Sequence, residues 1–196
     1  MANSRLHKLE LIHYPALDML YCPNNFIKAL NPRFCPELRA IICDGNRLSE
    51  LDLSKNQKLE FLTLSKNPLT TLKLGYLPNL PGLLCYDCEL SELNLNSVPN
   101  LSNLSCDNNK LTKLDFSVVP KLKMLTCEDN QFTELDLSQL PNLEYIACGG
   151  NNISYLDVSC CPKLINFSCD SSVEIKMRPD QKKDKHYNDL DLVINC

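Results

Sequence analysis

Residues Pro120–Leu140 read PKLKMLTCEDNQFTELDLSQL, and this stretch is one complete copy of a 21-residue unit. Counted from its proline, the units begin at Pro15, Pro36, Gln57, Pro78, Pro99, Pro120, Pro141 and Pro162, with no insertion or deletion between them. In all eight units the third position is leucine and the sixth is Leu, Ile or Phe. The eighth position is cysteine in seven units, and the eleventh is asparagine in six. A fixed period of this length predicts a solenoid in which each unit forms one coil.

The pattern Leu-x-x-Leu-x-Cys-x-x-Asn-x-Leu resembles the leucine-rich-repeat signature, in which Asn or Cys is expected at the polar position. Each unit also repeats within itself, since Phe132, Leu135 and Leu137 give a second Leu-x-x-Leu-x-Leu spacing. In this respect the chain is similar to the short nested repeats of bacterial proteins called the IRREKO type. The resemblance covers 15–172. It implies a leucine-rich-repeat solenoid, mostly β: a right-handed curved coil of eight 21-residue coils with a parallel concave β-sheet.

The register of the repeat divides the chain into three parts. Residues 1–14 predict an N-terminal half coil or cap, because Leu6, Leu9 and Leu11 match the second half of a unit. Residues 15–172 are the repeats, and 173–196 predict a C-terminal cap. Three apolar residues of that cap are expected to fold over the last coil: Leu190, Leu192 and Ile194. A disordered interaction tail is the alternative for the same segment.

Within a coil, positions five to nine predict a short strand that pairs in parallel with its counterpart about 4.8 Å away. Alternation directs the sixth and eighth positions into the core and the fifth, seventh and ninth outward. The asparagine column lies where the chain turns, and its amide can donate to and accept from backbone groups that the turn leaves unpaired. The Leu-x-x-Leu-Asp-Leu-Ser side predicts a second line of small strands or extended turns, interrupted by Pro32 in the first coil.

The chain has 12 cysteines, and seven of them occupy the predicted core column. Free cysteine packs as a small buried hydrophobe, so this usage favours a reducing compartment over a disulfide framework. Cys85-Tyr86-Asp87-Cys88 matches a Cys-x-x-Cys motif, which elsewhere binds zinc or performs redox chemistry. Both of its cysteines fill repeat columns, however, and no second pair is present. We therefore predict neither a metal site nor a cofactor.

Composition argues against several functional classes. The net charge of -4 gives no basic field for nucleic acid. No apolar run approaches the roughly 18 residues of a membrane span, and the N-terminal residues MANSRLHKLELIHY lack a secretory signal. Three histidines, two of them in the half coil, allow no Cys-His or Ser-His arrangement to be argued. The chain is predicted to have no catalytic residues and not to be an enzyme.

The outward positions carry the candidate binding residues. In the first coils they are apolar and aromatic, and in the later coils they include acidic residues, a combination typical of protein interfaces. Strand propensity alone would also place aromatic and branched residues there, which is the alternative. Gly82 leaves a gap in the fifth column that we interpret as a notch for a partner side chain. The predicted partner-binding residues are Met19, Tyr21, Ile42, Phe61, Gly82, Leu84, Tyr86, Asp107, Met124, Glu128 and Tyr145.

These features predict a non-catalytic module, a monomer on its own, that binds one protein partner through its concave sheet in a cytoplasm. The bacterial resemblance implies an effector delivered to host cytosol by a non-Sec secretion system, or an inhibitor of such an effector enzyme. An inhibitor would occlude the enzyme with its aromatic patch, while its acidic end engages basic residues near the active site. The alternative is a surface or adhesive leucine-rich-repeat protein.

Overall fold

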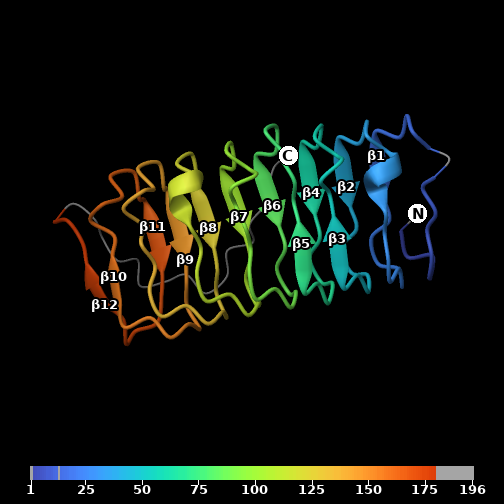
Figure 1. The fold of residues 1–196 in the computed structure, drawn as a ribbon. Helices are drawn as coiled ribbons and strands as arrows, with labels where there is room; N and C mark the ends of the chain where they lie inside the picture. Colours follow the sequence, from blue (N-terminus) through green and yellow to red (C-terminus); the bar gives the residue numbers. More distant parts are fainter. Residues whose placement is uncertain (1, 13, 180–196) are drawn as a thin grey trace.

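The computed structural model describes residues 2–12 and 14–179. Its main feature is one eight-stranded parallel sheet whose short strands lie side by side along the long axis of the molecule (Figure 1). In spatial order these strands are β1 (Met19–Tyr21), β2 (Ala40–Ile42), β4 (Phe61–Thr63), β6 (Gly82–Leu84), β7 (Asn103–Ser105), β8 (Met124–Thr126), β9 (Tyr145–Ala147) and β11 (Asn166–Ser168).

Equivalent positions of successive coils pair with each other throughout this sheet. Met19 pairs with Ala40, and Leu20 pairs with Ile41, each partner lying 21 residues further along the chain. The same offset joins Asn166 to Tyr145 at the other end. The predicted solenoid of eight 21-residue coils with a parallel sheet is therefore confirmed.

The strands are shorter than the sequence predicted, covering positions five to seven and not five to nine. The reason lies at position ten, which has a left-handed backbone in seven successive coils, with φ between 51° and 68°. These residues are Asn24, Gly45, Lys66, Asp87, Asn108, Asp129 and Gly150. Asn, Asp and Gly tolerate this conformation better than other residues. Because of this turn the chain leaves the sheet soon after position seven.

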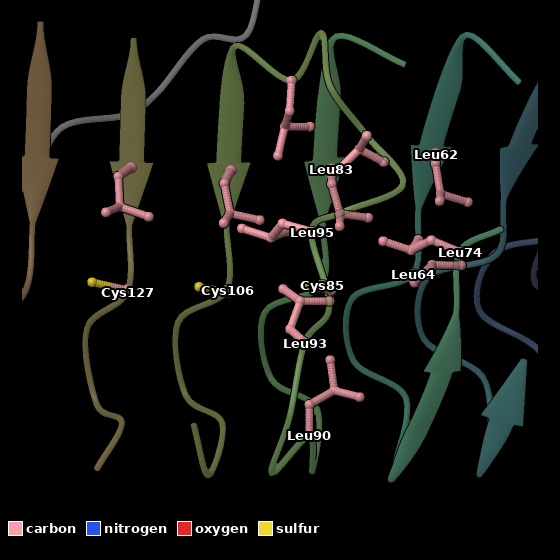
Figure 2. Packing of buried hydrophobic residues seen from close by; sticks show 14 of the residues in the cluster. Leu62, Leu64, Leu74, Leu83, Cys85, Leu90, Leu93, Leu95, Cys106 and Cys127 are labelled. Atoms are coloured by element: carbon pink, nitrogen blue, oxygen red, sulfur yellow. The ribbon is translucent and has the colours of Figure 1, made fainter. Parts of the chain in front are cut away.

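The core is a narrow column of leucine and cysteine side chains. Leu83 and Cys85, at positions six and eight, are fully buried, and Leu90, Leu93 and Leu95 from the return side of the coil pack among the same core residues. Figure 2 shows Cys85, Cys106 and Cys127 at equivalent places in successive coils. Burial of one leucine side chain contributes about 1.5 to 3 kcal/mol, so the repeated column stabilises the stack coil by coil.

The return side of the coils carries little regular structure. β3 (Glu50–Asp52) pairs in parallel with β5 (Thr71–Lys73), and β10 (Tyr155–Asp157) pairs in parallel with β12 (Glu174–Lys176). Two short 3-10 helices, η1 (Pro32–Phe34) and η2 (Phe116–Val118), lie elsewhere on this side. Proline suits the first helical position of η1, since it has no N–H to leave unpaired there. The predicted second line is thus two separate strand pairs within the described residues.

The first coil is hydrogen-bonded to the residues that precede it. Asn25 Oδ1 accepts from the backbone N–H groups of Ser4 and Leu6, both at 3.0 Å. The N–H of Phe26 donates to the carbonyl of Leu6 at 2.7 Å. These bonds satisfy groups that the terminal coil of a solenoid would otherwise expose.

At the other end, β12 falls within the predicted C-terminal cap. The predicted packing of Leu190, Leu192 and Ile194 lies outside the described residues, so the boundaries of the three parts stay predictions.

Candidate functional site

An asparagine ladder holds the ends of the strands. Asn109 Nδ2 donates to the carbonyls of Cys106 in its own coil, at 3.0 Å, and of Cys85 in the preceding coil, at 2.9 Å. Its Oδ1 accepts from the Leu90 N–H at 3.0 Å. The same three contacts recur at Asn46, Asn67, Asn130 and Asn151. The predicted double role of the amide is confirmed.

Cys88 replaces the ladder asparagine in one coil. Its Sγ lies 3.7 Å from the Leu64 carbonyl and 3.6 Å from the Tyr86 carbonyl, and a thiol is only a weak donor. The N–H of Leu69, which an asparagine at this position would bind, donates to the Asn67 carbonyl at 2.7 Å. The backbone therefore adjusts locally to the missing amide.

We call the outward side of the eight-stranded sheet, together with the ninth-position residues that follow each strand, the sheet face. Met19 and Tyr21 on β1 are its most exposed large apolar residues from the predicted set, at 55% and 49%. The remaining members of that set are all half-buried: Ile42, Phe61, Gly82, Leu84, Tyr86, Asp107, Met124, Glu128 and Tyr145. The structure brings the predicted residues together on one face. Their role in binding stays a prediction.

Not every outward side chain reaches the surface. Thr63 and Thr126 are 7% exposed, and Ala147 is 2% exposed, because neighbouring coils crowd the seventh column. At Gly82 the surface is open, since an added Cβ would have no atom beyond its chain neighbours nearer than 4.0 Å. A small side chain would therefore fit at this position, and the notch for a partner side chain stays a prediction.

Two aspartates of the ninth column link consecutive coils. Asp107 accepts from the Thr126 hydroxyl at 2.5 Å and from the Glu128 N–H at 2.8 Å. Asp44 accepts from the Thr63 hydroxyl and from the Ser65 N–H, the latter at 2.9 Å. Sequence reasoning treated these carboxylates only as surface charge. The signal that it missed is the threonine 19 residues after each aspartate.

The later coils concentrate negative charge at positions nine and ten, just after the C-terminal ends of the strands. Burial raises the pKa of the half-buried Glu128, and the neighbouring carboxylates of Asp107, Asp129 and Asp170 raise it further. Gly149 places no side chain between them: a Cβ built there would lie 3.5 Å from a carboxylate oxygen of both Glu128 and Asp170. Among the described residues, the ion pairs involve other carboxylates. We call Asp107, Glu128, Asp129 and Asp170 the acidic edge.

A hollow of about 280 Å³ lies over β7, β8, β9 and β11. It is at the N-terminal ends of these strands, whereas the acidic edge follows the C-terminal ends. Its lining consists of Asn103, Lys123, Met124, Glu144, Tyr145, Ile165 and Asn166. Ile165 is 70% exposed although its N–H is anchored to the Glu144 carbonyl at 2.9 Å. Sequence reasoning missed Ile165 because it considered only positions five, seven and nine. The available signal was the fourth column, which reads Asp18, Arg39, Glu60, Pro81, Ser102, Lys123 and Glu144 before reaching isoleucine.

A second hollow, of about 830 Å³, lies on the return side between the half coil and β5. Its lining mixes cations and anions, and two pairs among them are already joined: Lys8 with Glu10 at 2.5 Å and Lys73 with Asp52 at 4.0 Å. The charges on this side are therefore largely balanced by one another.

Burial keeps the core thiols protonated. It raises the pKa of Cys43, Cys85, Cys106 and Cys127 well above the usual value, and that of Cys148 to about 12. A thiol must lose its proton to act as nucleophile or metal ligand. Within the part of the chain that the structure describes, no group of three or more His, Cys, Asp or Glu side chains is arranged to hold a metal ion.

Residues 2–12 and 14–179 contain no helix long and apolar enough to cross a membrane.

No protein-family model matches the chain, and no curated protein matches it in sequence. Solved structures do match its fold. The leucine-rich-repeat domain of APL1B has a TM-score of 0.78 at 19% identity, over 90% of this chain and 56% of that one. Internalin InlF from Listeria monocytogenes has a TM-score of 0.68 at 17% identity, over 91% of this chain and 57% of that one.

The functional domain of InlJ, also from Listeria monocytogenes, includes a cysteine ladder. It matches with a TM-score of 0.50 at 26% identity, over 86% of this chain and 47% of that one. The chain thus spans only about half the length of these solved chains. From the repeat, the solenoid and these likenesses, the chain has a leucine-rich-repeat fold that is structurally similar to the Listeria internalins.

Proposed function

We propose that the chain is a non-catalytic module that binds one protein partner through its sheet face. The observation that carries this proposal is the exposure of Met19 and Tyr21 on β1, on the same face of the sheet as the half-buried Phe61 on β4 and Leu84 on β6. Large apolar side chains on a rigid sheet supply contact area at little cost in conformational entropy. A leucine-rich-repeat solenoid is usually not a catalytic fold, which agrees with a binding role.

The proposed setting is a cytoplasm, where the core cysteines stay reduced, and the proposed partner is an enzyme that the module restrains. Occlusion would be the mechanism, since a rigid slab of eight coils can cover an active site without supplying any chemistry. An effector delivered to a host cytosol is the related possibility within the same class. The cysteines of the described residues are free thiols, which is the state expected in a reducing compartment.

Affinity capture from bacterial and host lysates tests the proposal. The wild type is compared with a Tyr21→Asp, Phe61→Asp variant and with a matched control, Tyr76→Asp, Tyr155→Asp, which changes two exposed aromatics outside the eight-stranded sheet. Circular dichroism confirms that all three fold. A protein retained by the wild type and control but lost by the sheet-face variant supports the proposal. Equal capture by all three would place binding elsewhere.

A second candidate function is that of a surface or adhesive repeat protein, and the likeness to Listeria internalins favours it. Counting free thiols in the denatured native-source protein separates the candidates. All 12 cysteines should titrate if the protein works in a reducing compartment. A substantially lower count would favour the surface role.

A further inference from the structure

The hollow over β7, β8, β9 and β11 has the composition of a side-chain receptor. Met124, Tyr145 and the exposed Ile165 give it an apolar lining. The two charged residues of its lining pair with each other, with Lys123 Nζ 3.3 Å from Glu144 Oε1. At about 280 Å³ it lies below the usual range of small-molecule sites, roughly 300 to 1,000 Å³. A protruding apolar side chain suits it better than a cofactor.

Exposure of Ile165 has no explanation in the packing of the coil. The fourth column is otherwise polar, charged or proline in the preceding seven coils, as expected for a position that faces water. An isoleucine that is 70% exposed and backed by a hydrogen-bonded backbone leaves apolar area uncovered. Such area at the rim of a hollow is typical of a surface that is covered when a partner binds.

The acidic edge lies at the other end of the same strands. Met124 at position five and Glu128 at position nine are four residues apart, so their Cα atoms are separated by at most about 13 to 14 Å. Asp107, Asp129 and Asp170 stand beside Glu128 and raise the local negative charge. A ligand that spans the sheet from the hollow to this edge would meet apolar surface first and then carboxylates.

We propose that the hollow and the acidic edge together receive an extended segment of a partner protein that carries a large apolar side chain and, four residues away, a lysine or arginine. Side chains at i and i+4 of an extended segment point to the same side and lie about 13 Å apart, which is far enough to reach from the hollow to the acidic edge. Charge complementarity selects the cation. This inference rests on the proposed function and names the partner's chemistry.

Selection from a display library of random 12-residue peptides against the full chain tests the inference. Enriched peptides are synthesised, and their Kd is measured by fluorescence polarisation at low salt. We expect an apolar residue and a Lys or Arg four positions apart, at least tenfold weaker binding to Ile165→Asp, and weaker binding to Glu128→Gln. Raising the salt to 500 mM should also weaken binding, whereas the control Tyr76→Asp should bind as the wild type does.

The remaining outcomes overturn the inference in distinguishable ways. Peptides lost with Tyr21→Asp but not with Ile165→Asp would leave the proposed function standing and move the site to the first coils. Peptides insensitive to every sheet-face change would count against both. An empty selection rejects the receptor. Competition of selected peptides by a synthetic peptide of residues 180–196 would assign the hollow to this chain's own C-terminal segment and not to a partner.

Discussion

Replacing Asn109 by alanine tests the asparagine ladder on which the geometry of the sheet face depends. The Asn109 Nδ2 group donates to the Cys85 carbonyl at 2.9 Å and to the Cys106 carbonyl at 3.0 Å. The Oδ1 atom accepts from the Leu90 N–H at 3.0 Å. Each such bond contributes on the order of 1 kcal/mol net. We therefore expect Asn109→Ala to lower the free energy of unfolding by about 3 kcal/mol.

For a chain of this size, about 1 kcal/mol corresponds to roughly 2 to 4 °C in Tm, so the variant should melt about 6 to 12 °C lower. Urea unfolding followed by circular dichroism measures the free energy directly. Asn152→Ala is the matched control, because Asn152 has an exposed side chain. Asn109→Asp retains the acceptor for Leu90 but turns a carboxylate oxygen towards the Cys85 and Cys106 carbonyls in a buried site, so at pH 7 it should destabilise the fold at least as much as Asn109→Ala. Equal stability of Asn109→Ala and Asn152→Ala would refute the reasoning.

Three further predictions concern the ladder, the acidic edge and the buried cysteine column. Cys88→Asn should raise the stability by about 1 kcal/mol in urea unfolding, because it restores the ladder amide; a loss would mean that this coil has no room for it. Glu128→Gln should raise Tm at pH 7, because the pKa of Glu128 is higher in the native state than in the unfolded chain. The wild-type protein therefore loses stability as pH rises from about 4.5 through the native pKa, and the glutamine variant does not. The gain should therefore vanish near pH 4 in thermal melts. Iodoacetamide at pH 7 should spare Cys85, Cys106 and Cys127 in the folded protein and alkylate them in urea, as read by mass spectrometry, since burial keeps them as thiols; rapid labelling of the folded column would contradict the burial.

Most of the architecture could be predicted from the sequence, because a solenoid repeats one local solution. Once Leu104 and Cys106 point inward in one coil, a residue 21 positions away meets the same surroundings. The amide chemistry of asparagine then determined the ladder, since few other side chains can donate to two carbonyls and accept from an N–H at one turn. The length of the strands was less accessible, because it depends on the left-handed turn at position ten.

The sequence by itself determined the period, the inward columns and the face on which Met19, Tyr21 and Phe61 lie, because strand alternation and a constant period are local properties. Only the tertiary structure decided which outward residues are exposed, since Thr126 is buried and Ile165 is not. It also decided that Asp107 links two coils while Glu128 stands among carboxylates. Exposure and electrostatics depend on what the neighbouring coils place alongside each residue, and a pattern within one unit does not contain that information.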